Sequence, residues 1–460
     1  MPAAITGLRL ETRAALLRRY GSFSQAYSAA FQADLSHFGD ERGFIAYKKM
    51  AGTALVLADP VASPDNFGEL IELFLRQNPV FCQISRPTAE LLASRGGFFI
   101  NEFGTETLIE LPDFDFKGAK KQSFRAAFNR AATAGYVIKE CPLSSVSIED
   151  VQSVSQAWKR TRPLGKRETA FLVRPLVLHD EPEVRTFFAF DRESRLVAFA
   201  VFDPVYRDGV VVGYMLQHAR HRPGADTAVQ LAVKRFAIEQ FKAEGRKWLF
   251  LGLSLFHDIE DKDFAAHKNW LIRRAFRTVY TSAIFNRYFY AVQGLAENKR
   301  RFHGTTEQTY YAFNRLPSLT RLIKMARACR DNLRLIGRSR ISHVETASAP
   351  SDRPYCCAQP RQPLRLRCSP GPGRATSRQD RWDLSVAAVR RQIRLCLGAS
   401  HAKLRPLGVC VRHLQLAANA PVLSNEFYCA GDRSPATPPL ASLSSPPAGT
   451  PTWNTDLFHP

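Results

Sequence analysis

The sequence contains no long uninterrupted hydrophobic run. Its most apolar window, Phe187–Phe202, is broken by four charged residues, Asp191, Arg192, Glu193 and Arg195. A membrane-spanning helix needs roughly 18 or more consecutive apolar residues, so this window does not predict one. The first 21 residues carry several charges and lack the apolar centre of a secretory signal. We therefore expect a cytoplasmic protein.

Cysteine is scarce in the first three quarters of the chain. Only Cys82, Cys141 and Cys329 precede residue 346, and they are too far apart to show the spacing of a metal site. In a reducing compartment they are expected to stay as thiols. The sequence predicts no metal site and no cofactor.

Lysine and apolar periodicity are almost absent from residues 346–460. This segment holds more than half of the prolines, six of the nine cysteines and a single lysine, Lys403. Such a composition cannot bury enough apolar surface to offset the entropy lost on ordering, so we predict a disordered tail. The same Arg-, Pro- and Cys-rich texture is also what a shifted reading frame in GC-rich DNA would produce.

Acidic residues are outnumbered. The 460 residues include 64 Lys and Arg against 42 Asp and Glu, which gives a formal charge of +22. That balance favours a polyanionic partner, either nucleic acid or an anionic membrane surface, although a generally basic protein would show it too.

Before residue 346 the pattern alternates between strands and helices. The first unit has a hairpin (43–57), a helix (67–77), a strand (80–84), a helix (88–94) and two strands separated at Gly104 (98–111). The second has a helix (120–134), a strand (136–140), a helix (148–160), a three-stranded meander (185–218), a helix (225–243) and a strand (247–251). This repetition predicts a duplicated α+β architecture with domains at 1–112 and 113–345.

One strand–loop–helix segment, residues 209–228, suits an anion. A long apolar strand runs into a basic turn, and the helix that follows offers its free first amides. The turn His221-Arg-Pro-Gly224-Ala225-Asp226 nearly matches the pyrophosphate loop of GNAT acyltransferases, but it lacks the second glycine. An ordinary strand–helix turn is the alternative interpretation.

Three further segments combine basic and aromatic or apolar residues. Helix 117–130 places Phe124 and Phe128 on one face and basic residues, among them Arg125, on another, so it is either a core helix with a solvated back or one wall of a phosphate groove. Helix 318–338 either lies on anionic lipid or packs on the domain. The segment Arg287–Phe313 joins aromatics to Lys299, Arg300 and Arg301, a mixture suited to a bound polyanion.

Other candidate residues lie in a loop and at a strand end. Glu168 is the single acid of the basic loop 158–171, so its pKa should be lowered and it should act as a charge partner. The buried strand 248–255 contains Gly252 and Ser254 near its end, where backbone often lines a substrate.

Taken together, these features resemble the C-terminal synthase domain of the phosphatidylglycerol lysyltransferase family, bacterial aminoacyl-tRNA-dependent lipid-modifying enzymes with tandem GNAT-like domains. The resemblance covers residues 40–315. It rests on pieces in the family's order: Tyr47, Leu57-Ala-Asp-Pro60, Gly97-Phe98, Phe103-Gly104-Thr105-Glu106, Phe124-Arg125, Asn129-Arg130, Gly135, Val197-Ala-Phe-Ala200, Leu251-Gly-Leu-Ser-Leu255, Tyr290-Ala-Val-Gln-Gly-Leu295, Lys299 and Phe302.

The resemblance implies two tandem GNAT-like domains, with Arg287–Phe313 as the closing helix and strand of the second. It also implies a tunnel that receives an aminoacyl-tRNA end on one side and a lipid headgroup on the other, without a metal. The sequence departs from the family at its acidic-Leu-Met-Arg motif. That motif should fall near Tyr214–Gln217, where neither the acid nor the arginine is present. The membrane-embedded half of many family members is not seen in this sequence.

We therefore hypothesise an aminoacyltransferase that moves a lysyl- or alanyl-class group from aminoacyl-tRNA to phosphatidylglycerol or a related acceptor. The alternatives are an acyl-CoA-dependent N-acyltransferase of the same fold and an inactive lipid- or RNA-binding module. The expected partners are aminoacyl-tRNA, anionic phospholipid and the inner membrane surface, with peripheral attachment there. His218, as proton acceptor, and Arg220 are the candidate catalytic residues. The candidate substrate-binding residues are Arg125, Arg130, Glu168, Tyr214, Gly224, Gly252, Ser254, Lys299 and Arg301.

Overall fold

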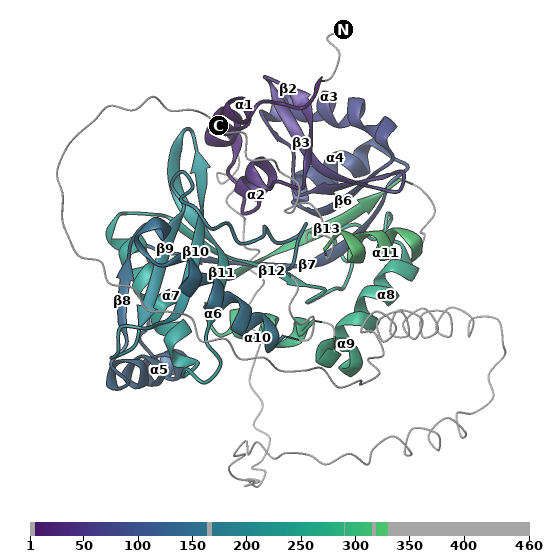
Figure 1. Ribbon diagram of the computed structural model, residues 1–460. Coiled ribbons are helices and arrows are strands. Elements are labelled where there is room, and N and C mark those ends of the chain that lie inside the picture. Colours follow the sequence, from purple (N-terminus) through teal and green to yellow (C-terminus); the bar gives the residue numbers. More distant parts are fainter. Residues whose placement is uncertain (1–4, 163–167, 289, 315–318, 330–460) are drawn as a thin grey trace, which may run out of the picture. The chain divides into compact units, whose positions relative to one another are not determined.

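The computed structural model describes residues 5–162, 168–288, 290–314 and 319–329 (Figure 1). The predicted tail 346–460 and the last part of helix 318–338 lie outside these residues. The strands join one mixed sheet of 13 strands in the order β1-β2-β3-β4-β6-β13-β7-β12-β11-β10-β9-β8, and β5 pairs with β3.

The first half of the chain forms one end of this sheet. Its strands are β1 (Ile5–Thr6), β2 (Ser36–Asp40), β3 (Gly43–Met50), β4 (Thr53–Leu57), β5 (Val61–Ala62), β6 (Pro79–Ile84) and β7 (Phe99–Glu110). Its helices are α1 (Leu10–Tyr20), α2 (Ala26–Phe31), α3 (Pro64–Phe74), the 3₁₀ turn η1 (Leu75–Gln77) and α4 (Arg86–Arg95). Strands β3 and β4 are antiparallel, and α3 carries the chain over to β6, which pairs parallel with β4.

The second half repeats this order. Its strands are β8 (Val137–Glu140), β9 (Arg185–Phe190), β10 (Leu196–Arg207), β11 (Val210–His221) and β12 (Trp248–Leu255). Its helices are η2 (Ala119–Lys121), α5 (Gln122–Thr133), η3 (Leu143–Ser145), α6 (Ile148–Arg160) and α7 (Ala228–Ala243). Strands β10 and β11 are antiparallel, and α7 crosses over to β12, which pairs parallel with β11.

The two hairpins that precede the crossovers are built alike. Ala51 and Gly52 join β3 to β4, Asp208 and Gly209 join β10 to β11, and all four residues have φ between 45° and 80°. Positive φ at both turn positions is the geometry that matches the twist of a two-residue hairpin. The predicted duplicated α+β, tandem GNAT-like fold is confirmed, whereas the boundary between residues 112 and 113 stays a prediction.

The last described elements return to the first half. They are α8 (Trp270–Thr281), α9 (Ala283–Tyr288), α10 (Val292–Arg300), β13 (Thr305–Phe313) and α11 (Leu319–Ala328). Strand β13 lies between β6 and β7, so it does not close the second unit as the sequence suggested. The reason is side-chain burial on both of its faces: Tyr310 packs in one hydrophobic cluster, and Tyr311 and Phe313 pack in another.

Gly104 does not separate two strands, contrary to expectation. Strand β7 runs continuously through it, and the residue has a φ of 143°. A Cβ at this position would collide with the carbonyl oxygen of Ser254 and would lie 2.9 Å from the backbone nitrogen of Phe256. The glycine is therefore required because strand β12 approaches closely, not because the chain turns.

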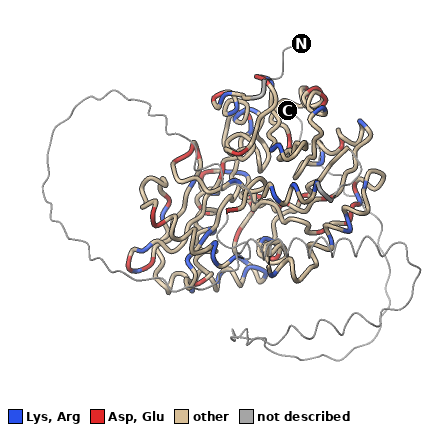
Figure 2. The backbone as a smooth tube through the Cα atoms, turned by 45° about the vertical axis from the view of Figure 1, so that its right-hand side comes forward, with Lys and Arg blue, Asp and Glu red and all other residues tan. Residues whose placement is uncertain are grey.

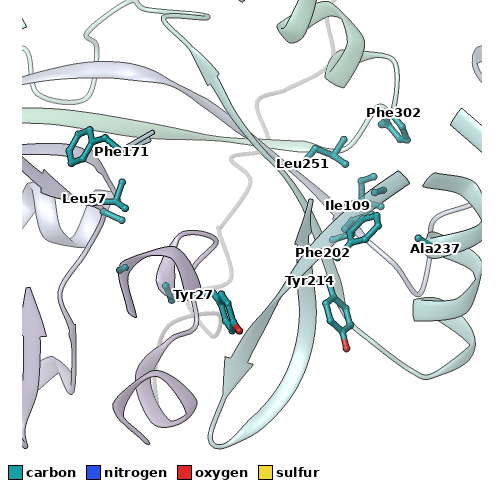
Figure 3. Close-up of a cluster of buried hydrophobic side chains, with 14 of the residues drawn as sticks. Tyr27, Leu57, Ile109, Phe171, Phe202, Tyr214, Ala237, Leu251 and Phe302 are labelled. Carbon is teal, nitrogen blue, oxygen red and sulfur yellow. The ribbon is translucent and has the colours of Figure 1, made fainter. Parts of the chain in front are cut away.

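The largest hydrophobic cluster draws side chains from both halves of the sheet. Figure 3 shows part of it, with Tyr27 and Leu57 from the first half and Phe202 and Tyr214 from the second. Tyr214 is 3% exposed and stacks on Phe241 with ring centroids 4.3 Å apart. Among the described helices, we find none with both the length and the apolar character needed to cross a bilayer.

Candidate functional site

Strands β11 and β12 separate soon after they meet. They pair only where Gly213, Tyr214 and Met215 lie opposite Trp248, Leu249 and Phe250. Beyond Phe250, β12 continues against β7 alone, whereas β11 continues against β10. Within the described part of the chain, no strand pairs with the backbone edges that face this opening. Such a place, at the end of parallel strands, is where a ligand can reach main-chain groups.

A β-bulge at Gly252 shapes this opening. The register of β12 against β7 shifts between Phe250 and Leu253, and Gly252 has a φ of 78°. A Cβ on Gly252 would lie 2.9 Å from the terminal methyl group of Met215 and 3.8 Å from Lys299 Nζ. The missing side chain therefore leaves room for the end of Met215, and the bulge brings Lys299 Nζ beside β12 at ordinary contact distance.

Lys299 is buried and does not face solvent as a free cation. It lies near the end of α10, is 8% exposed, and its Nζ donates a hydrogen bond to the carbonyl oxygen of Leu253 at 2.8 Å. Burial, opposed by the charge of Glu106 and assisted by that of Lys234, lowers the pKa of Lys299 to about 7. Near neutral pH, Lys299 is therefore an uncharged amine in a substantial fraction of the molecules.

Glu106 faces the same region from β7. Ser24 Oγ donates to both of its carboxylate oxygens, at 2.6 and 2.8 Å, and Gln83 Nε2 donates to one of them at 2.7 Å. Burial raises the pKa of Glu106, although these two hydrogen bonds and Lys299 oppose the change. The carboxylate is thus held in place by two side chains from the first half of the chain.

Lys234 completes the group from α7. Its Nζ lies over the ring of Phe302, 5.6 Å from the centroid. Burial, followed by the nearby charge of Arg301, lowers the pKa of Lys234 to about 8. We call Ser24, Gln83, Glu106, Lys234 and Lys299 the Lys299 cluster.

Sequence reasoning selected only Lys299 from this cluster and quoted Glu106 as part of a family motif. Ser24, Gln83 and Lys234 were missed. An acid inside a strand long enough to be buried was the available signal for Glu106, because a buried carboxylate needs partners.

His218, Arg220 and Glu168 form a second polar group, on the side of β11 that faces α6. Arg220 is 2% exposed and donates to the carboxylate of Glu168 and to Ser155 Oγ on α6. Burial by itself would raise the pKa of Glu168, but the hydrogen bond and charge of Arg220 outweigh it, and the pKa falls to about 2. The direction predicted for Glu168 is confirmed.

The hydrogen bond to His218 determines which ring nitrogen carries its proton. Arg220 Nη2 lies 3.2 Å from His218 Nδ1, and a guanidinium can only donate. Burial, followed by the charge of Arg220, holds the pKa of His218 well below its usual value, so the ring is neutral. Its proton must then be on Nε2. His218 also lines a cavity of about 460 Å³ together with Arg174 and Val201.

The exposed basic candidates have partners within the chain. Arg125 donates to the carbonyl oxygens of Phe116 and Gly118, at 3.1 and 2.6 Å. Arg301 donates to Ser123 Oγ at 3.2 Å and its guanidinium lies over the ring of Phe124. Figure 2 shows that Lys and Arg positions are spread widely along the chain and are interspersed with acidic positions.

The turn before α7 is occupied by a carboxylate of the chain itself. Asp226 Oδ1 accepts a hydrogen bond of 2.8 Å from the amide of Ala228, and Oδ2 lies 3.2 Å from Arg130 Nε. Gly224 lies in this turn with a φ of 90°. The first amide of the helix and Arg130 are therefore already paired with an anion.

The structure thus brings some of the candidate residues together and leaves others apart. Gly252 and Lys299 meet at the opening between β11 and β12, and Ser254 lies two residues further along β12, 2% exposed. His218, Arg220 and Glu168 form their own group, and Tyr214 is packed in the core. The roles assigned to all of these residues stay predictions.

Comparison with known proteins finds a matching family and similar sequences. The family model described as "Phosphatidylglycerol lysyltransferase, C-terminal" matches residues 14–313. The phosphatidylglycerol lysyltransferase of Staphylococcus xylosus is 23% identical over 328 residues, which cover 68% of this chain and 37% of that protein. The enzyme of the same name from Bacillus subtilis (strain 168) is 25% identical over 319 residues, 66% of this chain and 34% of that protein. The chain spans about a third of the length of these curated relatives.

Two solved structures are similar over nearly their whole length. L-PGS from Bacillus licheniformis has a TM-score of 0.58 and 20% identity, covering 72% of this chain and 99% of that chain. The C-terminal domain of a putative lysylphosphatidylglycerol synthetase from Agrobacterium fabrum has a TM-score of 0.57 and 18% identity, covering 71% and 98%. At these identities the likeness establishes the fold.

Proposed function

The chain belongs to the phosphatidylglycerol lysyltransferase C-terminal family, and on this premise we propose that it transfers an aminoacyl group from aminoacyl-tRNA to phosphatidylglycerol or a related lipid. The aminoacyl group is of the lysyl or alanyl class. Because aminoacyl-tRNA is made in the cytoplasm, the two substrates would meet at the inner face of the cytoplasmic membrane. The observation that carries the proposal is the position of Lys299, a buried lysine with a lowered pKa beside diverging strands of a domain from this family.

The reaction needs a proton acceptor and no redox partner. The headgroup hydroxyl oxygen attacks the carbonyl carbon of the aminoacyl ester, and the bond from that carbon to the tRNA ribose oxygen breaks. The hydroxyl proton passes to the uncharged Nζ of Lys299 and from there to the departing ribose oxygen. A base works best when its pKa lies near the working pH, which is the property that burial gives Lys299.

This assignment gives His218 a different task from the one hypothesised from the sequence. A neutral ring with its proton on Nε2 suits donation to a carbonyl oxygen better than removal of a hydroxyl proton. Its place beside the cavity, with Arg220 fixing Nδ1, supports a role as a donor.

The acyl-CoA alternative receives less support from the turn before α7. An acyl-CoA pyrophosphate would have to occupy the first amides of that helix, where Asp226 already accepts from Ala228. Asp226 would also repel the incoming phosphates.

One assay with the full-length chain tests the proposal. The protein is mixed with phosphatidylglycerol vesicles and labelled lysyl-tRNA, alanyl-tRNA or acetyl-CoA. We expect label in the lipid from an aminoacyl-tRNA. Label from acetyl-CoA alone would favour the N-acyltransferase, and salt-sensitive binding of tRNA or vesicles without turnover would favour an inactive binding module.

The pH dependence of transfer should follow Lys299. Because the uncharged amine is the active form and its pKa is about 7, the rate should rise as pH increases through 7 and level off above it. The pKa of His218 is lowered well below its usual value by burial, so the rise through pH 7 is not expected from this residue. Rates measured from pH 5.5 to 9 should therefore show the same rise in the His218→Asn variant. A rise that disappears in that variant would assign the titration to His218.

Adding a methyl group at the bulge should disturb the site. We expect Gly252→Ala to lower the unfolding free energy by about 1–3 kcal/mol because of its left-handed backbone. The new methyl would also lie 2.9 Å from the terminal methyl group of Met215, so Met215 must shift beside Lys299 and transfer should fall. Gly209→Ala is the matched control, because Gly209 has a φ of 80° and nothing within 4 Å of its Cβ position. Denaturant unfolding and the transfer assay should show a similar stability loss for both variants and loss of transfer for Gly252→Ala alone.

A further inference from the structure

The segment Trp270–Tyr288, which contains α8 and α9, carries charge of one sign. It includes four arginines and no aspartate or glutamate. It also contains three of the large hydrophobic side chains that the described part of the chain leaves exposed: Trp270 at 56%, Ile284 at 54% and Tyr288 at 59%. Single exposed apolar residues are ordinary, but this combination of apolar and purely cationic groups on adjoining helices is not.

Helix α8 is firmly held, so its exposed side is a defined surface. Asn269 caps it by accepting hydrogen bonds from the amides of Leu271 and Ile272, at 3.1 and 3.2 Å. Phe276 is 1% exposed and stacks on Phe256 with centroids 4.4 Å apart. Because the apolar side of α8 is packed against the protein, its opposite side remains available to a partner.

The opposite side of α8 presents a stripe of exposed residues. Trp270, Arg274 and Arg277 are spaced four and three residues apart, so they share one face of the helix, and all three are exposed. Neither Arg274 nor Arg277 has a side-chain hydrogen bond or ion pair among the described residues, in contrast to Arg273, which lies 3.9 Å from Asp261. Helix α9 follows α8 directly (Figure 1), and Ile284 and Tyr288 in it are also exposed.

We propose that this surface, formed by Trp270, Arg274, Arg277, Ile284 and Tyr288, docks on an anionic phospholipid bilayer. Arginine pairs with lipid phosphate, Trp and Tyr favour the headgroup level, and an aliphatic side chain enters the acyl boundary. A nucleic acid would use the arginines and could stack on the aromatic rings, but it offers nothing to Ile284. The apolar part of the surface is what favours lipid over RNA.

Helix α11 is a weaker candidate for this task. Its described residues pack on the first half of the sheet, with Met325 and Ala328 buried. Lys324 donates to the carbonyl oxygen of Ala51 and to Thr53 Oγ, at 2.8 and 3.1 Å. The described turns of this helix therefore pack on the domain, and two of its cations, Arg321 and Lys324, are engaged with protein.

Helix α10 connects the docking surface to the proposed reaction centre. Helix α10, which carries Lys299, contacts both α8 and β12. A bilayer bound at α8 and α9 would therefore present its headgroups near the opening between β11 and β12. This step rests on the proposed function, because it assumes that the acceptor is a lipid.

Vesicle flotation with the full-length chain tests the surface without any tRNA. The probes are vesicles of phosphatidylglycerol with phosphatidylcholine, and vesicles of phosphatidylcholine alone. We expect binding to the anionic vesicles, and a loss of at least roughly tenfold in the Trp270→Ser/Arg274→Glu/Arg277→Glu variant. The single variant Ile284→Asp on α9 should also weaken binding. It tests the surface independently if the triple variant fails to fold. The matched control is Arg9→Glu/Leu10→Ser, which changes an exposed basic–apolar pair on α1 and should bind like the wild type.

The outcomes separate this proposal from the proposed function. Undiminished vesicle binding by both α8–α9 variants overturns the docking surface, even if transfer to detergent-dispersed lipid is observed. Loss of tRNA binding with vesicle binding intact also overturns it and assigns the surface to RNA. If vesicle binding depends on these residues but no donor gives transfer, the docking surface is supported and the proposed reaction is contradicted.

Discussion

Replacement of Lys299 by methionine is expected to reduce transfer by at least roughly 10²-fold while making the folded chain more stable. The activity falls because the proton acceptor is gone. The stability rises because methionine has a similar length and needs no solvation, whereas the lysine is 8% exposed and has a lowered pKa. We expect a gain of about 1–3 kcal/mol in unfolding free energy at pH 6, measured by denaturant titration.

The pH dependence of this stability gain follows from the two pKa values of Lys299. The pKa is about 7 in the folded chain and 10.5 without the influence of the fold. Between these values the unfolded chain binds the extra proton, so the wild type gains stability as pH rises across this window. The advantage of methionine should therefore be largest below pH 7 and shrink toward pH 10.

Lys299→Arg is the matched control for the catalytic part of this prediction. Arginine keeps a cation at the position but does not deprotonate, so it should be as inactive as methionine without the gain in stability. Transfer at the wild-type rate by either variant would remove Lys299 from the reaction and leave the family membership untouched.

Replacement of Arg220 by alanine is expected to destabilise the chain by about 3–5 kcal/mol, because it leaves the carboxylate of Glu168 buried with less compensation. Arg220 is 2% exposed, and among the described residues Lys159, at 2.9 Å, is the ion-pair partner that Glu168 would keep. The pKa of Glu168, held at about 2 mainly by Arg220 against the effect of burial, should rise. Denaturant unfolding at pH 7 measures the loss.

A surface ion pair provides the comparison. Arg235 and Glu239 lie one helical turn apart on α7 and are both exposed, so Arg235→Ala should change stability by no more than about 1 kcal/mol. The double variant Glu168→Gln/Arg220→Met should recover much of the loss, because it leaves no unpaired buried charge. An Arg220→Ala variant as stable as the wild type would show that Glu168 finds solvent or another partner.

Local patterns in the sequence were enough to predict most of the elements. Helix α6, for example, begins and ends where predicted, at Ile148 and Arg160, because apolar residues recur at helical spacing and Ser147 caps its start. Alternation and turn residues likewise placed the β10–β11 hairpin. These signals act over a few residues, and a single sequence displays them directly.

The pairing of distant strands was not visible in the same way. Gly104 looked like a turn because glycine permits one, whereas its actual cause is β12, about 150 residues further along the chain. The environment of Lys299 depends on Glu106, whose partners Gln83 and Ser24 lie 23 and 82 residues from it. The residues next to Lys299 in the sequence do not indicate that this lysine will be buried near Glu106.

The position of β13 affects how this chain can fold as it is synthesised. Because β13 is the only strand that joins β6 to β7 in the described sheet, those two strands lack a common neighbour until residue 313 has left the ribosome. The first half therefore cannot complete its own sheet early, as amino-terminal domains usually do. The facing edges of β6 and β7 therefore stay unpaired until nearly the whole described chain has emerged.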